Sequence, residues 1–455
     1  MKKYFDVSWW LRLFLLGVLI IFSFVPRIYL LNTVPSVING DESGSILQPT
    51  QILLNKYGGI FSLTHDGSVS YIVFALKALA MLGLANNFGV LFPVRLVTFL
   101  FSIGAIGCFY LLARNHFTKI TSILTTILFA SSYWFINFSR ISWICVDSIF
   151  FGLLGLVVLD KIKKTGKLGY FLLEGVILAF ILYNYMGGRI YFVAIGLSLV
   201  WWTLRHHKKK LQIWYFGISI AVGVLLYLPQ MKVIVSNSDT FLARSKSVFV
   251  FNTGSEYYNI SPENKIGILK HQLKYSLKGF FLFDKKVSGE GIENQRLVPN
   301  DKSAINLMVK WFFWIGIVVM LLRKKIIYSW VLLYFLNIVL LQLPTVLIPS
   351  WSRAIEVLPI IYLVTAFSIE EITGIIGKLR QKNIFLAGLS LLVVLIALSD
   401  IKTYFSWVNS PAFNSANQPY ITIDELPDWY KEQYRIIEDG GEPFTYYDWY
   451  EKLKP

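Results

Sequence analysis

Long apolar runs alternate with short polar segments along most of the 455 residues of this chain. Most of these runs approach the roughly 17–25 residues that an α-helix needs to cross a hydrocarbon core about 30 Å thick. The pattern predicts about eleven membrane-spanning helices, at residues 9–31, 92–113, 120–136, 142–160, 169–186, 190–204, 212–231, 306–322, 326–347, 353–370 and 384–401. Because backbone polar groups need internal partners in lipid, the expected fold class is an all-α integral membrane bundle.

The composition supports an integral membrane protein. The chain is 55% hydrophobic and 16% aromatic, with a mean hydropathy of +0.57. Its net charge of +16 would suggest a nucleic-acid partner in a soluble protein. Here the basic residues fall largely in short loops between apolar runs, which is the distribution that the positive-inside rule describes. No nucleic-acid partner is therefore expected.

The charges of the short loops predict the orientation in the membrane. With the N-terminus in the cytoplasm, every predicted cytoplasmic loop is basic, namely 114–119, 161–167, 205–210, 323–325 and 378–382. The segment 68–86 is also apolar, but an extra span there would move these loops outside, so we expect it to lie in the plane of the outer interface. The first run is long for a signal peptide and lacks a small-residue cleavage site, which predicts an uncleaved span.

This topology divides the chain into two parts. Residues 1–401 form the expected transmembrane domain, whose outer loops cover residues 32–91 and 232–305. Residues 402–455 form a short extracytoplasmic tail. We therefore expect a multi-pass protein of the cell membrane, surrounded by membrane lipids, with any site in water on the outer side.

The tail is rich in acids and aromatic residues. It contains Asp428-Trp429-Tyr430 and Asp448-Trp449-Tyr450. Such clusters suit sugar binding, but they equally suit a polar cap whose aromatic rings lie at the lipid headgroups. We assign the tail no chemistry.

The two cysteines carry no functional signal. Cys108 and Cys145 both lie inside apolar runs. Their positions therefore predict neither a disulfide framework nor a thiolate metal site.

Two adjacent carboxylates, Asp41 and Glu42, follow the first predicted span. One interpretation is the start of a helix over about 43–54, since acids are favoured near a helix N-terminus. The other is catalytic: a carboxylate kept ionised beside arginines takes a proton from an attacking hydroxyl or amine. In that case one carboxylate is the base and its neighbour orients it.

Charged residues also lie within or at the ends of predicted spans, where burial in lipid is costly and a functional role is the default hypothesis. Within spans they are Arg27, Arg95, Asp147, Glu174 and Glu356, and at outer ends Arg140, Arg189 and Arg353. All but Glu174 fall toward the outer leaflet. Arginine suits phosphate because its planar fork donates two parallel hydrogen bonds. Together these arginines would form a cationic ring on the outer side, which suits a lipid-linked phosphate. Arginines that reach lipid headgroups, or that pair with Asp147 and Glu356, would give the same pattern.

Two further polar groups lie on the predicted outer side. His65-Asp66 in the first outer loop could bind phosphate or a metal, but a lone histidine is a weak signal. Tyr183-Asn184-Tyr185 with Arg189 closes one span and opens the next. These hydroxyls and the guanidinium suit a sugar or phosphate, and each tyrosine alone equally suits an aromatic belt.

These residues resemble the GT-C membrane glycosyltransferases that use polyprenyl-phosphate sugars, including protein O-mannosyltransferases and lipid A aminoarabinose transferases. Arg27, Pro35 and Gly40-Asp41-Glu42 are similar to the end of the family's first span and its acidic first outer loop. The later motifs, in the family's order, are Phe92-Pro93-Val94-Arg95, Asn137-Phe138-Ser139-Arg140 with Asp147, Tyr183-Asn184-Tyr185 with Arg189, Phe241-Leu242-Ala243-Arg244, and Ser352-Arg353 with Leu358-Pro359. The resemblance covers residues 20 to about 370. One departure is His65-Asp66-Gly67, where the family often has a basic residue and two prolines.

The resemblance implies a GT-C-type bundle that transfers one sugar from a polyprenyl-phosphate carrier, with inversion, to a lipid, glycan or protein acceptor. Asp41 would be the base, with Glu42 as its partner. The leaving phosphate would be stabilised by cations, the candidates being Arg95, Arg140, Arg189, Arg244 and Arg353. Segment 68–86 would line the access route for the lipid chain.

Three alternatives stay open at this point. Arginines supply positive charge, so no cofactor is required, yet a divalent ion could bridge Asp41, Glu42 and the phosphate. A transporter or flippase of a lipid-linked saccharide would also use charges within the membrane. A ligase or polymerase of different topology would use outer-loop arginines without the Asp-Glu pair.

Overall fold

The structure is a computed structural model that describes residues 9–64, 67, 69–205, 209–284, 296–299, 302–418 and 420–444. Each predicted span contains a helix or a helix pair. These are α1 (Trp9–Ile28), α4 (Leu91–His116), α5 (Lys119–Ser131) with α6 (Tyr133–Arg140), α7 (Cys145–Thr165), α8 (Leu168–Tyr183), α9 (Arg189–Arg205), α10 (Lys209–Ser236), α15 (Leu307–Leu322), α16 (Tyr328–Leu336) with the π-helical η3 (Asn337–Gln342), α18 (Leu358–Ile376) and α19 (Lys382–Val408).

Length and composition distinguish these helices. Among the described residues, α1, α4, α9 (with the turn before it), α10 and α19 are long and apolar enough to cross a membrane, as is the segment Tyr71–Phe88, and α5 with α6 would make a seventh span, bent by 59°. The helices α8, α15 and the run Tyr328–Gln342 are apolar but shorter. A multi-pass helical membrane protein is thus confirmed, and the count of eleven spans stays a prediction.

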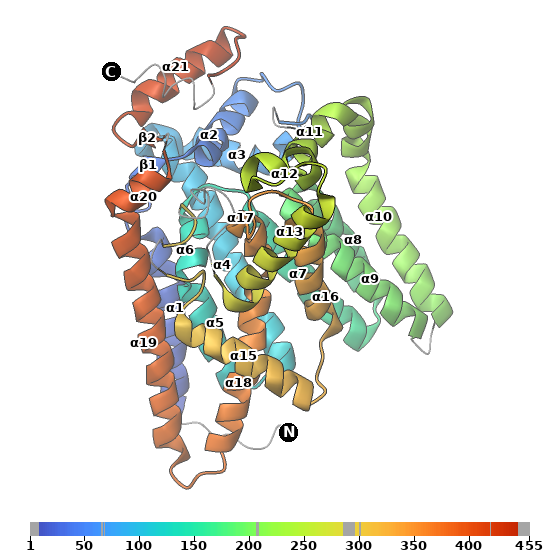
Figure 1. The fold of residues 1–455 in the computed structure, drawn as a ribbon, viewed down its shortest axis with the longest axis vertical. Helices are drawn as coiled ribbons and strands as arrows, with labels where there is room; N and C mark the ends of the chain where they lie inside the picture. Colours follow the sequence, from blue (N-terminus) through green and yellow to red (C-terminus); the bar gives the residue numbers. More distant parts are fainter. Residues whose placement is uncertain are drawn as a thin grey trace.

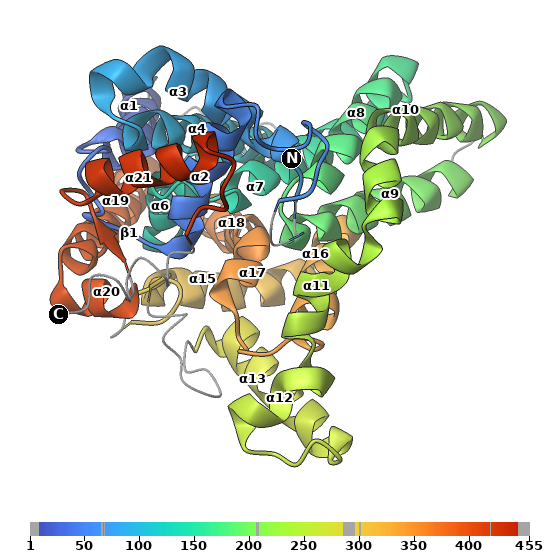
Figure 2. The same cartoon turned by 90° about the horizontal axis from the view of Figure 1, so that it is seen from above.

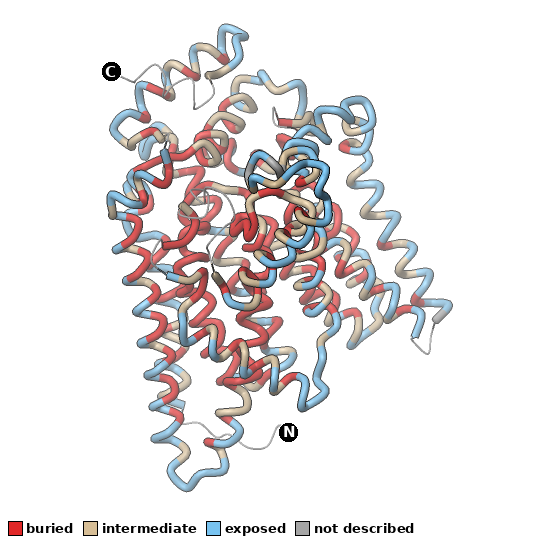
Figure 3. Tube along the Cα trace, in the orientation of Figure 1, coloured by how far each residue is buried: buried red, intermediate tan, exposed pale blue. Residues whose placement is uncertain are grey.

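The helices pack around α5 and α18, which are buried on nearly all sides (Figures 1 and 3). A helix that is apolar all round belongs in a core, because it has no polar face to turn outward. By contrast, α10 packs against α8 and α9 at the edge of the bundle and is mostly exposed, as expected of a helix that faces lipid.

Short elements gather at one end of the bundle (Figures 1 and 2). They are β1 (Val37–Ile38), α2 (Gly40–Leu53), η1 (Tyr71–Phe74) and α3 (Ala75–Phe88) from the first outer loop. In Figure 2, which looks along the bundle, α3 is seen along its length, so it runs across the end of the bundle. The segment Tyr71–Phe88 is one of the six that could span a membrane by composition, but this position matches the in-plane helix expected for 68–86.

Among the described residues between α10 and α15 lie three more helices, and short turns precede α9 and α18. The helices are α11 (Ser238–Val248), α12 (Val250–Tyr258) and α13 (Lys265–Leu282), and the turns are η2 (Met186–Gly188), α17 (Trp351–Ala354) and η4 (Ile355–Val357). The loop between α18 and α19, which carries Lys378 and Arg380, lies at the end of the bundle opposite α2 (Figure 1). This is the relative placement that the topology predicts, while the orientation in a membrane stays a prediction.

The C-terminal segment returns to the end of the bundle that holds α2. The last long helix, α19, continues to Val408, beyond the predicted boundary at 401. It is followed by α20 (Pro411–Ala416), β2 (Ile421–Thr422) and α21 (Leu426–Glu438). Strand β2 pairs antiparallel with β1, placing Ile421 opposite Ile38.

Candidate active site

The two acids of the first outer loop lie in the first turn of α2. Asn39 is the N-cap, and its side-chain oxygen accepts a hydrogen bond of 3.1 Å from the Glu42 amide. This cap satisfies one of the free amides of the first turn and fixes where the helix begins. The helix-start interpretation is therefore correct as local structure, and it turns Asp41 and Glu42 in different directions.

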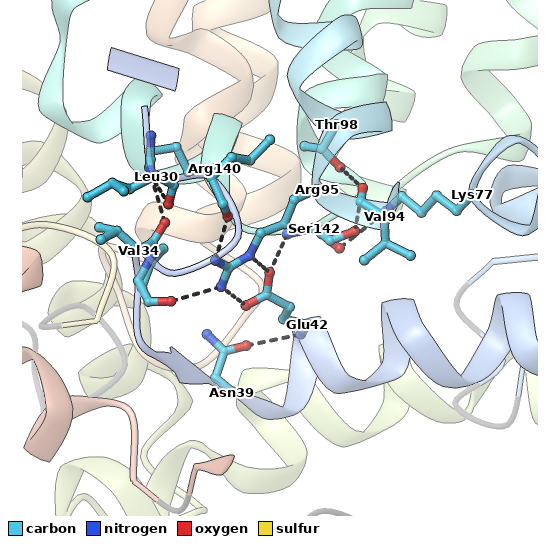
Figure 4. Close-up of polar contacts among 12 residues, drawn as sticks. Leu30, Val34, Asn39, Glu42, Lys77, Val94, Arg95, Thr98, Arg140 and Ser142 are labelled. Atoms are coloured by element: carbon cyan, nitrogen blue, oxygen red, sulfur yellow. Dashed lines mark hydrogen bonds and ion pairs between the residues drawn. The ribbon is translucent and has the colours of Figure 1, made fainter. Parts of the chain in front are cut away.

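Glu42 points into the protein and is completely buried (Figure 4). Its carboxylate accepts hydrogen bonds from Nε and Nη2 of Arg95 at 2.8 and 3.0 Å. Its Oε1 also accepts a hydrogen bond of 3.0 Å from the Ser142 amide. The pair connects α2 to α4 and to the segment after α6. This geometry gives Glu42 a positioning role instead of direct contact with a substrate.

Arg95 and Arg140 are both buried, and their guanidinium groups donate hydrogen bonds to backbone carbonyls around the turn between α1 and β1 (Figure 4). Arg95 also donates to the carbonyls of Leu31 and Pro35 at 3.0 and 3.1 Å. The guanidinium of Arg140 donates to four carbonyls of the same region, those of Pro26, Tyr29, Leu30 and Val34 at 2.7–3.1 Å. Irregular backbone needs such donors where water is excluded. These two arginines therefore do not form part of a ring that faces a phosphate.

Asp41 has the opposite environment to Glu42. Its side chain is 33% exposed, and its Oδ2 lies 3.2 Å from Nη2 of Arg296. Arg296 belongs to the large outer loop, and its carbonyl accepts a 3.3 Å bond from Asn137 on α6. Arg296 carries no signal in the sequence, because nothing in the neighbouring residues distinguishes it from other loop arginines.

The first turn of α7 lies among three carboxylates. Asp41, Asp147 and Glu356 all interact electrostatically with the Cys145 thiol, which also contacts the Tyr185 side chain. Asp147 is buried, with no hydrogen-bond partner for its Oδ1 among the described residues. The structure thus brings Asp147 and Tyr185, both predicted site residues, into the neighbourhood of Asp41.

Asp147 has a cationic neighbour that the sequence pattern does not reveal. Lys77, which is buried in α3, interacts electrostatically with Asp147 and Glu42 and donates a 3.2 Å bond to the Ser142 carbonyl. The lysine of a helix in the plane of the membrane surface ordinarily faces water. Only the packing of α3 therefore shows that Lys77 lies beside Asp147 and Glu42.

Glu356 is buried against α7 and η2. The Ser148 hydroxyl donates to its Oε1, and the Tyr191 hydroxyl donates to its carbonyl at 2.5 Å. A Cβ on Gly188 would lie 2.6 Å from the Cβ of Ser148 and 3.6 Å from Oε1 of Glu356. Glycine at 188 therefore permits the close approach of η2 to Ser148 of α7, beside Glu356.

A second polar region surrounds Arg189 at the start of α9. It is a small pocket lined by Leu63, Val69, Ser70, Leu182, Tyr183, Arg189, Tyr227, Gln230 and Phe241. The guanidinium of Arg189 lies 5.2 Å from the Phe241 ring centre, a cation–π contact. Ser70 Oγ and Gln230 Oε1 are buried without hydrogen-bond partners among the described residues. The pocket thus combines a cation with unused polar atoms.

The remaining predicted residues are distributed around this pocket and beyond it. The hydroxyl of Tyr183 donates to the Leu226 carbonyl at 2.8 Å, so its ring is what lines the pocket. Arg244 is exposed on α11, and Arg353 on α17 donates to the Val346 carbonyl at 2.8 Å. His65 lies outside the described residues.

Thr64, Gly67 and Val69, on either side of the residues that are not described, have defined positions. The Thr64 amide donates to the Val69 carbonyl at 2.9 Å, and Gly67 has a left-handed backbone with φ +68°. A Cβ on Gly67 would lie 1.9 Å from the Thr240 carbonyl oxygen. Gly67 therefore packs directly on α11, and Val69 lines the Arg189 pocket.

The described residues contain no cluster of side chains suited to bind a metal ion. Within them, no three His, Cys, Asp or Glu side chains are grouped so as to hold an ion. A divalent ion bridging Asp41 and Glu42 would first have to displace Arg95 from the Glu42 carboxylate. The residues present therefore do not fit that site.

Comparisons with known proteins identify the fold. No family model matches the sequence, and no curated protein matches it. Among solved structures, the oligosaccharyltransferase of Archaeoglobus fulgidus, tethered to an acceptor peptide, aligns with 98% of this chain at a TM-score of 0.57 and 14% identity. The ArnT of Cupriavidus metallidurans, bound to undecaprenyl phosphate, aligns with 93% at a TM-score of 0.52 and 12% identity.

The chain has the GT-C fold. It spans 60% of the length of the archaeal enzyme and 80% of the length of ArnT. The all-α GT-C-type bundle expected from the sequence is thereby confirmed. At this level of identity the likeness concerns the fold, so the chemistry has to be argued from the residues of this chain.

Proposed function

We propose that this protein is a membrane glycosyltransferase that moves a single sugar from a polyprenyl-phosphate carrier to an extracytoplasmic acceptor, with Asp41 as the base. The observation that carries the proposal is the contrast between two adjacent acids. Glu42 is buried in an ion pair that fixes α2, and Asp41, one residue earlier, is partly exposed beside Arg296 and interacts electrostatically with Cys145, as do the buried Asp147 and Glu356. A rigid element that presents one accessible carboxylate is what general-base catalysis needs.

The proposed reaction is a single displacement. A hydroxyl or amine of the acceptor attacks the anomeric carbon from the face opposite the phosphate, while Asp41 takes its proton. The bond between the anomeric carbon and the phosphate oxygen breaks, and its electron pair leaves with the polyprenyl phosphate. The configuration at the anomeric carbon is therefore inverted. The ion pair with Arg296 requires Asp41 in the ionised form, which is the form that accepts a proton.

We place the carrier phosphate beside Arg189, where the narrow pocket has to widen to admit it. A guanidinium stabilises the charge that develops on the leaving phosphate, and the lining supplies Ser70, Gln230 and the ring of Tyr183. His65, Arg244 on α11 and Arg353 on α17 remain candidate contributors. The proposal leaves out Arg95 and Arg140, because their guanidinium groups bond to Glu42 and to backbone carbonyls.

The solved structures with this fold support the choice of donor. ArnT was solved with undecaprenyl phosphate, and the archaeal oligosaccharyltransferase with an acceptor peptide. For this chain we propose a lipid-linked donor and a lipid, glycan or protein acceptor. The site and the C-terminal segment would face the outside of the cell membrane, with the N-terminus in the cytoplasm. The proposed step includes no metal.

The deciding experiment compares wild type with Asp41→Asn in proteoliposomes. The donors are undecaprenyl phosphates that carry a radiolabelled hexose or pentose, and the acceptors are lipid, glycan and peptide fractions of the source cells. We expect Asp41→Asn to stay folded and membrane-inserted while transfer falls about 100- to 10,000-fold. Asp239→Asn is the matched control, because it removes the same charge from the exposed, surface-paired Asp239 on α11.

Two outcomes would contradict the proposal. Wild-type turnover in Asp41→Asn would remove Asp41 as the base. Movement of the labelled lipid between leaflets, with no transfer by either protein, would identify a transporter of lipid-linked saccharide instead.

A further inference from the structure

The C-terminal segment and the first outer loop, which carries Asp41, are more than 370 residues apart in sequence yet pack together as one small unit. Strand β2 pairs with β1, the two residues that precede the N-cap of α2. The Ile423 amide extends this pairing with a 3.1 Å bond to the Ser36 carbonyl. The backbone that leads into Asp41 is thus held from one side by the C-terminal segment.

A direct side-chain contact reaches the cap itself. The Asn39 amide nitrogen donates to Oδ1 of Asn417 at 3.2 Å, while the Asn39 oxygen caps the amide of Glu42. Both asparagines are buried, and the Asn417 nitrogen donates to the Phe413 carbonyl of α20 at 2.8 Å. Both the oxygen and the NH2 group of the Asn39 side chain are hydrogen-bonded, so α2 and the C-terminal segment together fix its orientation.

Apolar packing reinforces the contact. Trp429 is completely buried in α21, in a cluster with Ile38, Ile46, Ile421 and Leu426. The neighbouring Tyr430 forms a side-chain hydrogen bond with Thr50 of α2. The motif Asp428-Trp429-Tyr430 therefore docks α21 on α2, as Figure 2 shows from above, and its tryptophan is not available to stack on a sugar.

We propose that the segment from Asn409 to Glu438 is a positioning element for catalysis, and that Asn417, acting through Asn39, sets the direction of the Asp41 carboxylate. The inference rests on the proposed function of Asp41 as base. Asp41 lies two residues after the N-cap, so a shift of Asn39 turns the first turn of α2 and moves the carboxylate. Misplacement by about 1 Å costs on the order of 100-fold in rate.

The test is a double-mutant cycle in the full-length protein. Asn417→Ala removes the acceptor, and Asn39→Ser removes the donor while keeping an oxygen for the cap. We expect each single variant to lower turnover about 10- to 100-fold, with the apparent KM for the undecaprenyl-phosphate sugar within about twofold. The double variant should be no slower than the slower single variant, because both act through one bond.

Asn414→Ala is the matched control. Asn414 lies on α20, which Asn417 caps at its C-terminal end; it is partly buried and has no side-chain hydrogen bond to β1 or α2 among the described residues. This variant should retain wild-type turnover. Multiplying effects in the double variant, or equal losses in Asn414→Ala and Asn417→Ala, would overturn the positioning role.

Amide hydrogen exchange separates this inference from the proposed function. Exchange over residues 40–46 should rise in Asn417→Ala and stay at the wild-type rate in Asn414→Ala. If the wild type transfers no sugar while Asn417→Ala still loosens α2, the glycosyltransferase proposal fails and the docking contact stands. If exchange or turnover in Asn417→Ala equals that of the wild type, the positioning inference fails by itself.

Discussion

Arg95 and Glu42 form a bidentate ion pair in which both side chains are completely buried. The pair lies where the end of α1, the start of α4 and the start of α2 meet, and it is one residue away from the proposed base. A pair of this kind stabilises a fold chiefly because neither charge can be left alone in a low-dielectric interior.

Glu42→Gln should therefore destabilise the protein by about 3–5 kcal/mol, since it leaves the Arg95 charge buried without a counter-ion. The measurement is the unfolding midpoint in detergent, together with the yield of folded protein. Asp428→Asn is the control, because the Asp428 to Lys431 pair is highly exposed at 3.9 Å and should contribute little. Equal midpoints for Glu42→Gln and wild type would show that the pair does not anchor α2.

The sequence identifies the bundle well but not the directions of its charged side chains. Apolar runs report burial in lipid directly, and acids beside a cap residue report a helix start. Whether Arg95 and Arg140 face a phosphate or the protein depends on the backbone between residues 29 and 36. That turn exposes carbonyls that need donors, and a one-dimensional pattern of charges does not show where unsatisfied acceptors lie.

The same limit explains Arg296 and Asn417. Each contacts the first outer loop across hundreds of residues of sequence, through side-chain geometry that periodicity does not report. Asp147, in contrast, was accessible to sequence reasoning, because an acid inside an apolar run is rare enough to be informative by itself.

Gly67→Ala should impair the Arg189 pocket without affecting Asp41. The added Cβ would meet the Thr240 carbonyl at 1.9 Å, and alanine also disfavours φ +68°. The loop must then separate from α11, which raises the apparent KM for the lipid-linked donor more than it lowers turnover.

Gly440→Ala is the control for the loop prediction, because Gly440 has φ +82° but no atom within 4 Å of an added Cβ. It isolates backbone strain, of about 1 kcal/mol. If both alanine variants change the donor KM equally, the packing of the loop on α11 is not what shapes the donor site.

Arg189→Gln should weaken binding of undecaprenyl phosphate about 10- to 100-fold, the loss expected for one charge-assisted hydrogen bond to phosphate. Titration of the lipid into the detergent-solubilised protein, followed by native mass spectrometry, measures the affinity. Arg205→Gln provides the matched control at the opposite end of α9, where the Arg205 guanidinium stacks on Trp201 at 3.6 Å. An unchanged affinity in Arg189→Gln would place the carrier phosphate elsewhere.

His271 supplies a prediction about pH. It lies on α13, outside the predicted spans, with its ring centre 4.2 and 4.6 Å from those of Tyr258 and Tyr275. Burial, and secondly the charge of Lys274, lower the pKa of His271 below its ordinary value of 6.5. The folded protein therefore binds this proton less readily than the unfolded chain does.

The sign of the effect follows from that difference in proton binding. Well above pH 6.5 the imidazole is neutral in both states, so the free energy of unfolding is independent of this group. As the pH falls through 6.5 toward the lower folded-state pKa, the unfolded chain takes up the proton first and the folded state loses stability. The unfolding midpoint of the wild type should thus fall more steeply between pH 7.5 and about 5.5 than that of His271→Gln, which keeps a polar side chain but does not titrate. Parallel curves for the two proteins would mean that the aromatic contacts of His271 do not disfavour its protonation.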